Sequence, residues 1–166
     1  MLKKCRLLYK GDMVAALIYI FVGNLLFIFA ASIYYFAQTP GYKYLSYGFF
    51  MFFIYCVGKG SVMYYMYSRK YYYYKNLSAL TPKHVSNEKR YTEYRINKKN
   101  INRRRYVYMM VASCLIAVAG IFLPQKSILM GSTIPIALIT GIELCIGLLT
   151  EFRLREYDRI LNKPLS

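Results

Sequence analysis

The chain has 166 residues, of which 57% are hydrophobic and 18% aromatic, with 20 Tyr and no Trp. Soluble domains are usually about 45–50% apolar, so this composition argues against an ordinary soluble domain. The formal net charge of +16 reflects 23 Lys and Arg against 7 Asp and Glu. Because the apolar residues gather in long runs, we predict an all-α integral membrane protein that forms one domain over residues 1–166.

Four apolar runs are long enough to cross a bilayer, which needs about 20 residues for a hydrocarbon core of about 30 Å. In chain order they cover about residues 13–36, 45–67, 106–123 and 127–150. Pro40-Gly41 and Pro124 are turn and helix-stop signals between them. We therefore predict four transmembrane helices arranged as two antiparallel hairpins in a four-helix bundle.

The basic residues predict the orientation of these spans. They precede the first span, fill the segment before the third and follow the fourth, whereas the two short loops hold only Lys43 and Lys126. Lys and Arg stay on the cytoplasmic face, so we expect both termini there (N-in and C-in). A bacterial inner membrane and an organelle membrane fit equally well. The first run exceeds the about 7–15 residues of a signal-peptide core, which favours a retained span.

Residues 68–105 form a basic cytoplasmic segment between the second and third spans. The helix before it should stop ahead of Thr81, because Pro82 disfavours a helical conformation in its predecessor. The polar residues that follow are compatible with a helical arm that extends the third span inward. The arm and the third span form either one helix or two helices with a break near Asn100 to Asn102.

Residues 151–162 follow the fourth span and predict an amphipathic helical extension at the C-terminal end. Leu154, Tyr157 and Leu161 recur there at helical spacing. These three side chains should therefore face the protein rather than solvent.

Two opposite charges lie deep in the predicted spans. Lys59 is the only basic residue of 45–67, and Glu143 is the only acidic residue of 127–150. Both lie about 10–12 Å below the cytoplasmic surface at about 1.5 Å per residue. Because an intramembrane charge costs at least about 2.5–3.5 kcal/mol, we predict an ion pair. Asn24 should point into the bundle as a third polar group.

Three interpretations of Lys59 and Glu143 are open. The pair fixes the register of two helices, or Lys59 extends toward the cytoplasm while Glu143 is protonated or faces a partner subunit, or both line an ion or proton path. Small neighbours should let the two helices approach closely. These neighbours are Gly58, Gly60, Ser61, Gly141 and Gly147.

The segment before the third span is rich in Lys, Arg and Tyr, with Glu88 and Glu93 as its acidic residues. One interpretation is a topology signal with attraction to anionic lipids. The other is a phosphate-binding or partner-binding surface for an acidic protein, a nucleotide or a nucleic acid. Its candidate residues are Arg95, Lys98, Lys99, Arg103, Arg104 and Arg105. The last three sit where a topology anchor belongs, so the first three are the better ligand candidates.

No pattern in the chain is typical of an enzyme, a metal site or a cofactor site. The sequence VGKGS at 57–61 lacks the spacing and context of a phosphate-binding loop, and no HExxH or GxSxG occurs. The four Cys are too far apart for a CxxC element, and His84 is the only His. We therefore expect a non-catalytic protein without a metal or cofactor.

These observations predict a small multi-pass accessory or regulatory protein that binds a partner through its basic cytoplasmic face. Its expected partners are the bilayer, including anionic lipids, and a protein partner or further copies of the chain. A nucleic acid or nucleotide at the cytoplasmic arm is a weaker option. The alternative is an oligomeric channel or pore-forming effector, including a ligand-gated one or one with a role in defence or immunity.

Overall fold

The computed structural model describes residues 2–37, 39–79, 81–124 and 126–162. This part of the chain is helical and contains no strand. It forms four long helices: α1 (Leu2–Phe36), α2 (Pro40–Asn76), α3 (Pro82–Gly120) and α4 (Lys126–Leu161). The prediction of an all-helical chain is therefore confirmed.

Three of the four helices, α1, α2 and α4, are long and apolar enough to cross a membrane. The third predicted span, 106–123, does not reach this standard among the described helices. The reason lies in its two ends: α3 ends at Gly120, and Arg103 to Arg105 precede its apolar part. The stretch Tyr106–Gly120 is about 22 Å long at about 1.5 Å per residue, which is shorter than a hydrocarbon core of about 30 Å.

Prolines set two helix starts. α2 begins at Pro40 and α3 at Pro82, where the missing N–H costs nothing because the first helical donors have no partner within the helix. Thr81 has extended backbone angles before α3, as expected for a residue ahead of proline. Of the two alternatives for the arm, the structure has the single helix, since α3 runs through Asn100 to Asn102 without a break.

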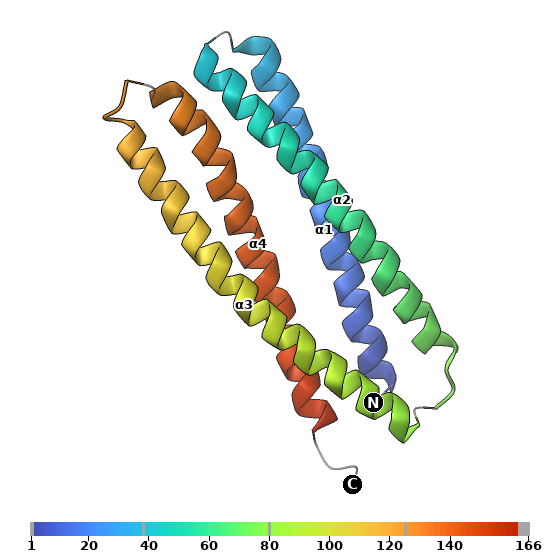
Figure 1. Cartoon of the computed structure of the whole chain (residues 1–166). Coiled ribbons are helices and arrows are strands. Elements are labelled where there is room, and N and C mark those ends of the chain that lie inside the picture. The colour runs from blue at the N-terminus through green and yellow to red at the C-terminus, as the bar shows by residue number, and fades with distance from the viewer. Residues whose placement is uncertain (1, 38, 80, 125, 163–166) are drawn as a thin grey trace.

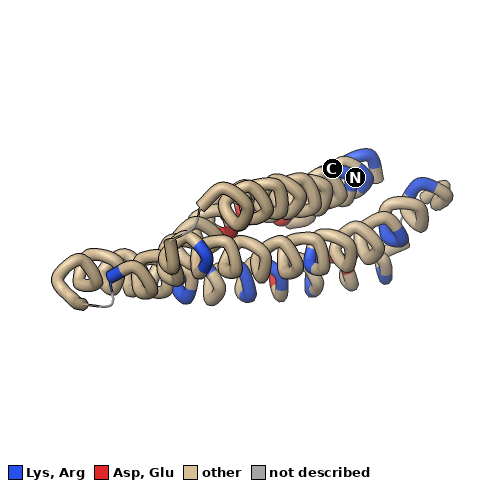
Figure 2. Tube along the Cα trace, turned by 90° about the horizontal axis from the view of Figure 1, so that it is seen from above, with Lys and Arg blue, Asp and Glu red and all other residues tan. Residues whose placement is uncertain are grey.

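The helices form two antiparallel hairpins, α1–α2 and α3–α4, that meet mainly along α2 and α4 (Figure 1). Both termini and the α2–α3 connection lie at one end of the molecule, which we call the terminal end. The opposite end, with the α1–α2 and α3–α4 connections, is the hairpin end. Lys and Arg far outnumber Asp and Glu along the chain (Figure 2). No Cα atoms of α2 and α3 approach within 8 Å, so these two described helices stay apart.

Glycines permit close helix contacts, but the glycines beside Lys59 and Glu143 do not bring α2 and α4 together as predicted. A Cβ at Gly60 would lie 2.9 Å from the carbonyl oxygen of Ala16, so Gly60 lets α2 approach α1. A Cβ at Gly58, Gly141 or Gly147 would meet open space. The α2–α4 approach instead occurs at Gly48, where a Cβ would lie 2.6 Å from Cγ of Pro135 on α4.

The buried core is divided into two clusters. The cluster at the terminal end contains Cys5, Leu8, Tyr9, Tyr74, Leu154, Tyr157 and Leu161. The second cluster lies further along the bundle and contains Ala15, Tyr19, Cys56, Ile139 and Ile146. The first cluster includes the three periodic residues of the C-terminal extension, so this part of α4 packs inward as its spacing predicts.

Candidate functional site

The structure brings Lys59 and Glu143 into direct ion-pair contact between α2 and α4. Glu143 also accepts hydrogen bonds from the hydroxyls of Tyr19 on α1 (2.8 Å) and Tyr55 on α2 (2.9 Å). The side chain of Glu143 is only 4% exposed, whereas that of Lys59 is 27% exposed. Because each carboxylate oxygen has a donor, this geometry favours a structural pair that joins three helices.

Asn24 does not belong to this cluster, and its predicted inward orientation is wrong. The residue is exposed, and its amide nitrogen donates to the carbonyl oxygen of Ile20 in its own helix at 2.9 Å. The spacing of polar residues could not reveal this, because it does not fix the rotation of α1 about its axis.

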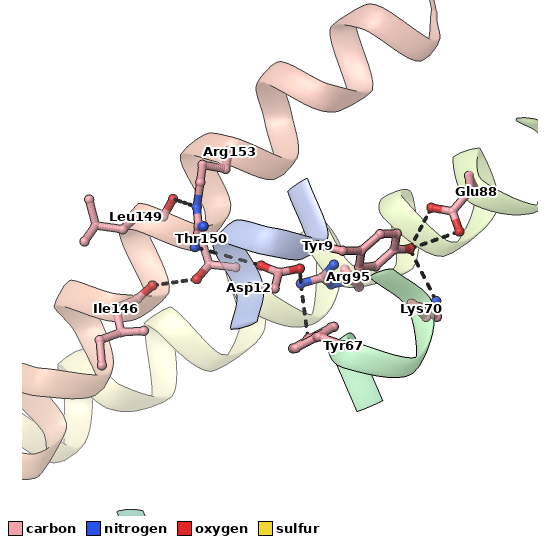
Figure 3. Close-up of polar contacts among 10 residues, drawn as sticks. All are labelled: Tyr9, Asp12, Tyr67, Lys70, Glu88, Arg95, Ile146, Leu149, Thr150 and Arg153. Carbon is pink, nitrogen blue, oxygen red and sulfur yellow. Dashed lines mark hydrogen bonds and ion pairs between the residues drawn. The ribbon is translucent and has the colours of Figure 1, made fainter. Parts of the chain in front are cut away.

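A second buried ion pair, between Asp12 and Arg95, was not predicted. Nη2 of Arg95 lies 2.8 Å from Oδ2 of Asp12, and the two side chains are 8% and 1% exposed. Arg95 also donates to the hydroxyl of Tyr67 at 3.2 Å, and Nη2 of Arg153 lies 3.9 Å from Oδ1 of Asp12. Figure 3 shows these side chains converging from all four helices.

This contact changes the interpretation of Arg95, which the sequence suggested as a ligand-binding residue. Burial is the largest single effect and lowers the pKa of its guanidinium, but Asp12, Tyr67 and Tyr91 together raise it, so the pKa is raised overall. Arg95 is therefore charged and held by a carboxylate of the bundle. One signal was available in the sequence: Asp12 is the only acidic residue before Glu88, next to a strongly apolar run.

Glu88 forms a third buried cluster near the terminal end (Figure 3). It accepts hydrogen bonds from the hydroxyls of Tyr9 on α1 (2.8 Å) and Tyr74 on α2 (2.7 Å). Nζ of Lys70 lies 3.4 Å from the Tyr9 hydroxyl and 3.2 Å from the ring centroid of Tyr91. The sequence analysis named Glu88 only as an acidic residue of the basic cytoplasmic segment and did not predict this network.

Glu151 on α4 holds two arginines. Nη1 of Arg103 on α3 lies 3.2 Å from it, and Nη2 of Arg155 lies 2.6 Å from it within the same helix. Arg103 also donates to the side-chain oxygen of Asn100 at 2.9 Å. The contacts of Arg103 therefore join α3 to α4. This role differs from the predicted role of Arg103 as a free phosphate ligand.

The remaining predicted ligand residues, Lys98, Lys99, Arg104 and Arg105, have no carboxylate within 4 Å among the described residues. Lys98, Arg104 and Arg105 are exposed, whereas Lys99 is half-buried. Burial lowers the pKa of Lys99, and the nearby positive charge of Lys59 lowers it further. These lysines and arginines are thus the predicted candidates that stay available for a ligand.

A pocket of about 410 Å³ lies between α2, α3 and α4. It connects the Lys59–Glu143 pair with the basic part of α3. Its charged lining residues are Lys59, Arg95, Lys98, Lys99, Arg103, Glu143 and Glu151. The structure therefore brings together both groups of residues that the sequence suggested separately.

Within the described residues, no group of three or more His, Cys, Asp and Glu side chains is placed to hold a metal ion. Cys5, Cys56, Cys114 and Cys145 are free thiols, of which the first two are buried. The ring nitrogens of His84 contact the hydroxyls of Thr81 (2.9 Å) and Tyr73 (3.0 Å), so this side chain joins the ends of α2 and α3.

No family model, no curated protein and no solved structure matches the chain.

Proposed function

We propose that the chain is a small, non-catalytic, multi-pass membrane protein that binds an acidic partner protein through the exposed face of α3. In this proposal it acts as an accessory or regulatory subunit, with both termini and the terminal end on the cytoplasmic side. The basic residues at that end support the orientation, because Lys and Arg stay on the cytoplasmic face.

The membrane location is supported by the apolar surface that α1, α2 and α4 expose. Phe21, Phe29, Met51 and Leu149, for example, are 58–67% exposed, and large exposed apolar areas mark membrane or protein contacts. The apolar part of α3 is short, but a bilayer can thin locally around a short span at modest cost. We therefore retain it as a fourth span in the proposal.

The single observation that carries the partner-binding proposal is a row of exposed residues along α3. Arg90, Tyr94, Lys98, Ile101 and Arg105 recur at steps of three or four residues, and all five are exposed. The three cations of the row lack a carboxylate within 4 Å among the described residues. Such a row combines positive charge with apolar area on one rigid helix, which suits an acidic, partly apolar surface.

The test is purification of the intact protein from its membrane in mild detergent, followed by identification of the copurifying proteins. The test variant is Lys89→Gln/Arg90→Gln/Arg105→Gln, which removes three exposed charges from α3. Its matched control is Lys3→Gln/Lys4→Gln/Lys10→Gln, which removes three exposed charges from α1 at the same end. We expect the α3 variant to lose an acidic partner that the control retains.

Three results would contradict this proposal. The α3 variant could keep the same partner as the control. The purified protein could carry nucleic acid in place of an acidic protein. It could also copurify only with further copies of itself.

The orientation is tested separately by cysteine labelling. In a variant without native Cys, a single Cys in place of Lys43 should react with a membrane-impermeant maleimide added outside intact cells or organelles. A single Cys in place of Lys89 should react only after the membrane is opened. The reverse pattern would contradict the proposed topology.

An oligomeric channel is the second candidate, because Lys59 and Glu143 line the same pocket as the arm lysines. If the pocket continues as a pore between copies, Glu143→Gln should abolish ion flux into vesicles that contain the purified protein. Absence of flux through the unaltered protein would exclude this candidate.

A further inference from the structure

We propose that the pocket between α2, α3 and α4 binds an anionic glycerophospholipid, with the lipid phosphate held by Lys98 and Lys99. This inference rests on the proposed membrane location. The pocket shares Lys98 and Tyr94 with the exposed α3 row, but it differs from that row in its shape and its ligand class.

The charge of the pocket favours an anion. Its lining includes five cationic side chains and two carboxylates. Lys59 and Arg103 are paired with these carboxylates, and Arg95 is paired with Asp12 behind the pocket wall. Lys98 and Lys99 are left without such a partner in the described part of the chain, so the pocket has an excess of positive charge.

Arg95 provides a second, independent indication of an anionic ligand. Its side chain is 8% exposed and lines the pocket. Its Nη1 atom is buried and has no hydrogen-bond partner among the described residues. A buried donor without a partner is costly, so a phosphate oxygen that reached Nη1 from the pocket would be stabilised there.

Part of the remaining lining is apolar, which favours a lipid over a free phosphate compound. Met63 and Met66 contribute from α2, and Leu144 and Leu148 from α4. Met66 and Leu148 are each about half exposed. With a headgroup at the lysines, an acyl chain could lie along these residues, as in basic pockets between membrane helices.

Gly147 offers a position at which a larger side chain would fill the pocket and so test whether a ligand binds there. It lines the pocket, and a Cβ at this position would meet no atom within 4 Å. A leucine here would therefore occupy ligand space without a steric conflict at Cβ, and leucine also has the higher helix propensity. Gly141, on the same helix, has the same open surroundings but does not line the pocket. Gly147→Leu and Gly141→Leu are thus a matched pair.

The experiment measures binding of dioctanoyl phosphatidylglycerol to the purified full-length protein in mild detergent. The reference probes are dioctanoyl phosphatidylcholine, inorganic phosphate and ATP. The first variant is Lys98→Gln/Lys99→Gln, with Lys3→Gln/Lys10→Gln as its control for lost charge. The second is Gly147→Leu, with Gly141→Leu as its control. Far-UV circular dichroism and gel filtration verify that each variant is folded.

We expect phosphatidylglycerol to bind at least about tenfold more tightly than phosphatidylcholine. Removal of both lysines should weaken phosphatidylglycerol binding about 30-fold, at the usual contribution of a basic residue near an anionic lipid. Gly147→Leu should abolish binding, and both controls should stay within about twofold of the unaltered protein.

Three results would overturn the proposal: equal binding of the two lipids, retained binding in a folded Gly147→Leu protein, or full displacement of the lipid by inorganic phosphate or ATP. Failure here is distinguishable from failure of the partner proposal. The lipid assay contains no partner protein, and the partner test uses Lys89, Arg90 and Arg105, which do not line the pocket.

Discussion

The two ends of the bundle are held together by different interactions. Toward the terminal end, the buried carboxylates of Asp12 and Glu88 each receive polar contacts from two other helices. Toward the hairpin end, α2 and α4 pack closely at Gly48 and Pro135, and the Ser46 hydroxyl donates to a carbonyl of α1 at 2.8 Å. The first kind of contact relies on charge and the second on small residues.

This difference explains why a pocket exists in one region. Long charged side chains such as Arg95 can join helices whose backbones stay apart, whereas small-residue packing requires the backbones to approach. Since no Cα atoms of α2 and α3 come within 8 Å, only side chains bridge these two helices. Space remains between the bridges, and the pocket of about 410 Å³ occupies it.

The largest effect should follow from breaking the bridge at Asp12. Asp12→Ala leaves the Arg95 guanidinium buried without its carboxylate, and removal of one partner of a buried pair costs about 3–5 kcal/mol. Unfolding of the purified protein by SDS titration in mixed micelles measures this loss. Asp12→Leu/Arg95→Met removes both charges and should recover most of the stability. A harmless Asp12→Ala would show that the terminal end does not depend on this pair.

A smaller loss should follow from Lys59→Met, because Lys59 is 27% exposed and Glu143 retains two tyrosine donors. We expect a loss of about 1–3 kcal/mol, the usual cost of leaving a buried polar group less satisfied. Lys59→Met/Glu143→Leu should recover much of it in the same titration. If both single changes prove harmless, the pair does not hold α2 to α4.

The hairpin end should respond to added volume instead of lost charge. In Gly48→Ala the new methyl would lie 2.6 Å from Pro135 Cγ, so α2 and α4 must separate, at a cost of about 1–2 kcal/mol. Gly58→Ala is the matched control on the same helix, because its Cβ meets open space and alanine favours helix. Thermal unfolding in detergent should therefore shift in opposite directions for the two variants. Equal shifts would mean that close packing does not stabilise this end.

Local signals in the sequence predicted where the helices lie, but α1 begins at Leu2, earlier than the predicted span does. Apolar runs, Pro40 and Pro82 act within a few residues, and α1, α2 and α4 follow them. The ion pair of Lys59 and Glu143 was inferred from matched depth, which needs only chain direction and helical rise.

Helix rotation and long-range partners could not be predicted from these signals. Gly60 faces α1 and not α4, and Asn24 points outward. Both depend on how each helix is turned about its axis, which a weak apolar periodicity does not fix. No partner was predicted for Asp12 or for Glu88. Their burial depends on contacts with side chains of other helices, an arrangement that no single segment encodes.

The smallest effect concerns how the terminal end is closed. Arg6 donates to the carbonyl oxygens of Tyr74 (2.9 Å) and Leu77 (3.2 Å), and thereby ties the start of α1 to the end of α2. The last carbonyls of a helix lack partners within it, and a cation there is favourable. Arg6→Ala should cost about 1 kcal/mol and speed amide exchange in the last turn of α2. Lys4→Ala, at an exposed neighbour without such bonds, should leave that exchange unchanged. Unchanged exchange in Arg6→Ala would show that the contacts of Tyr74 with Glu88 hold this end without the arginine.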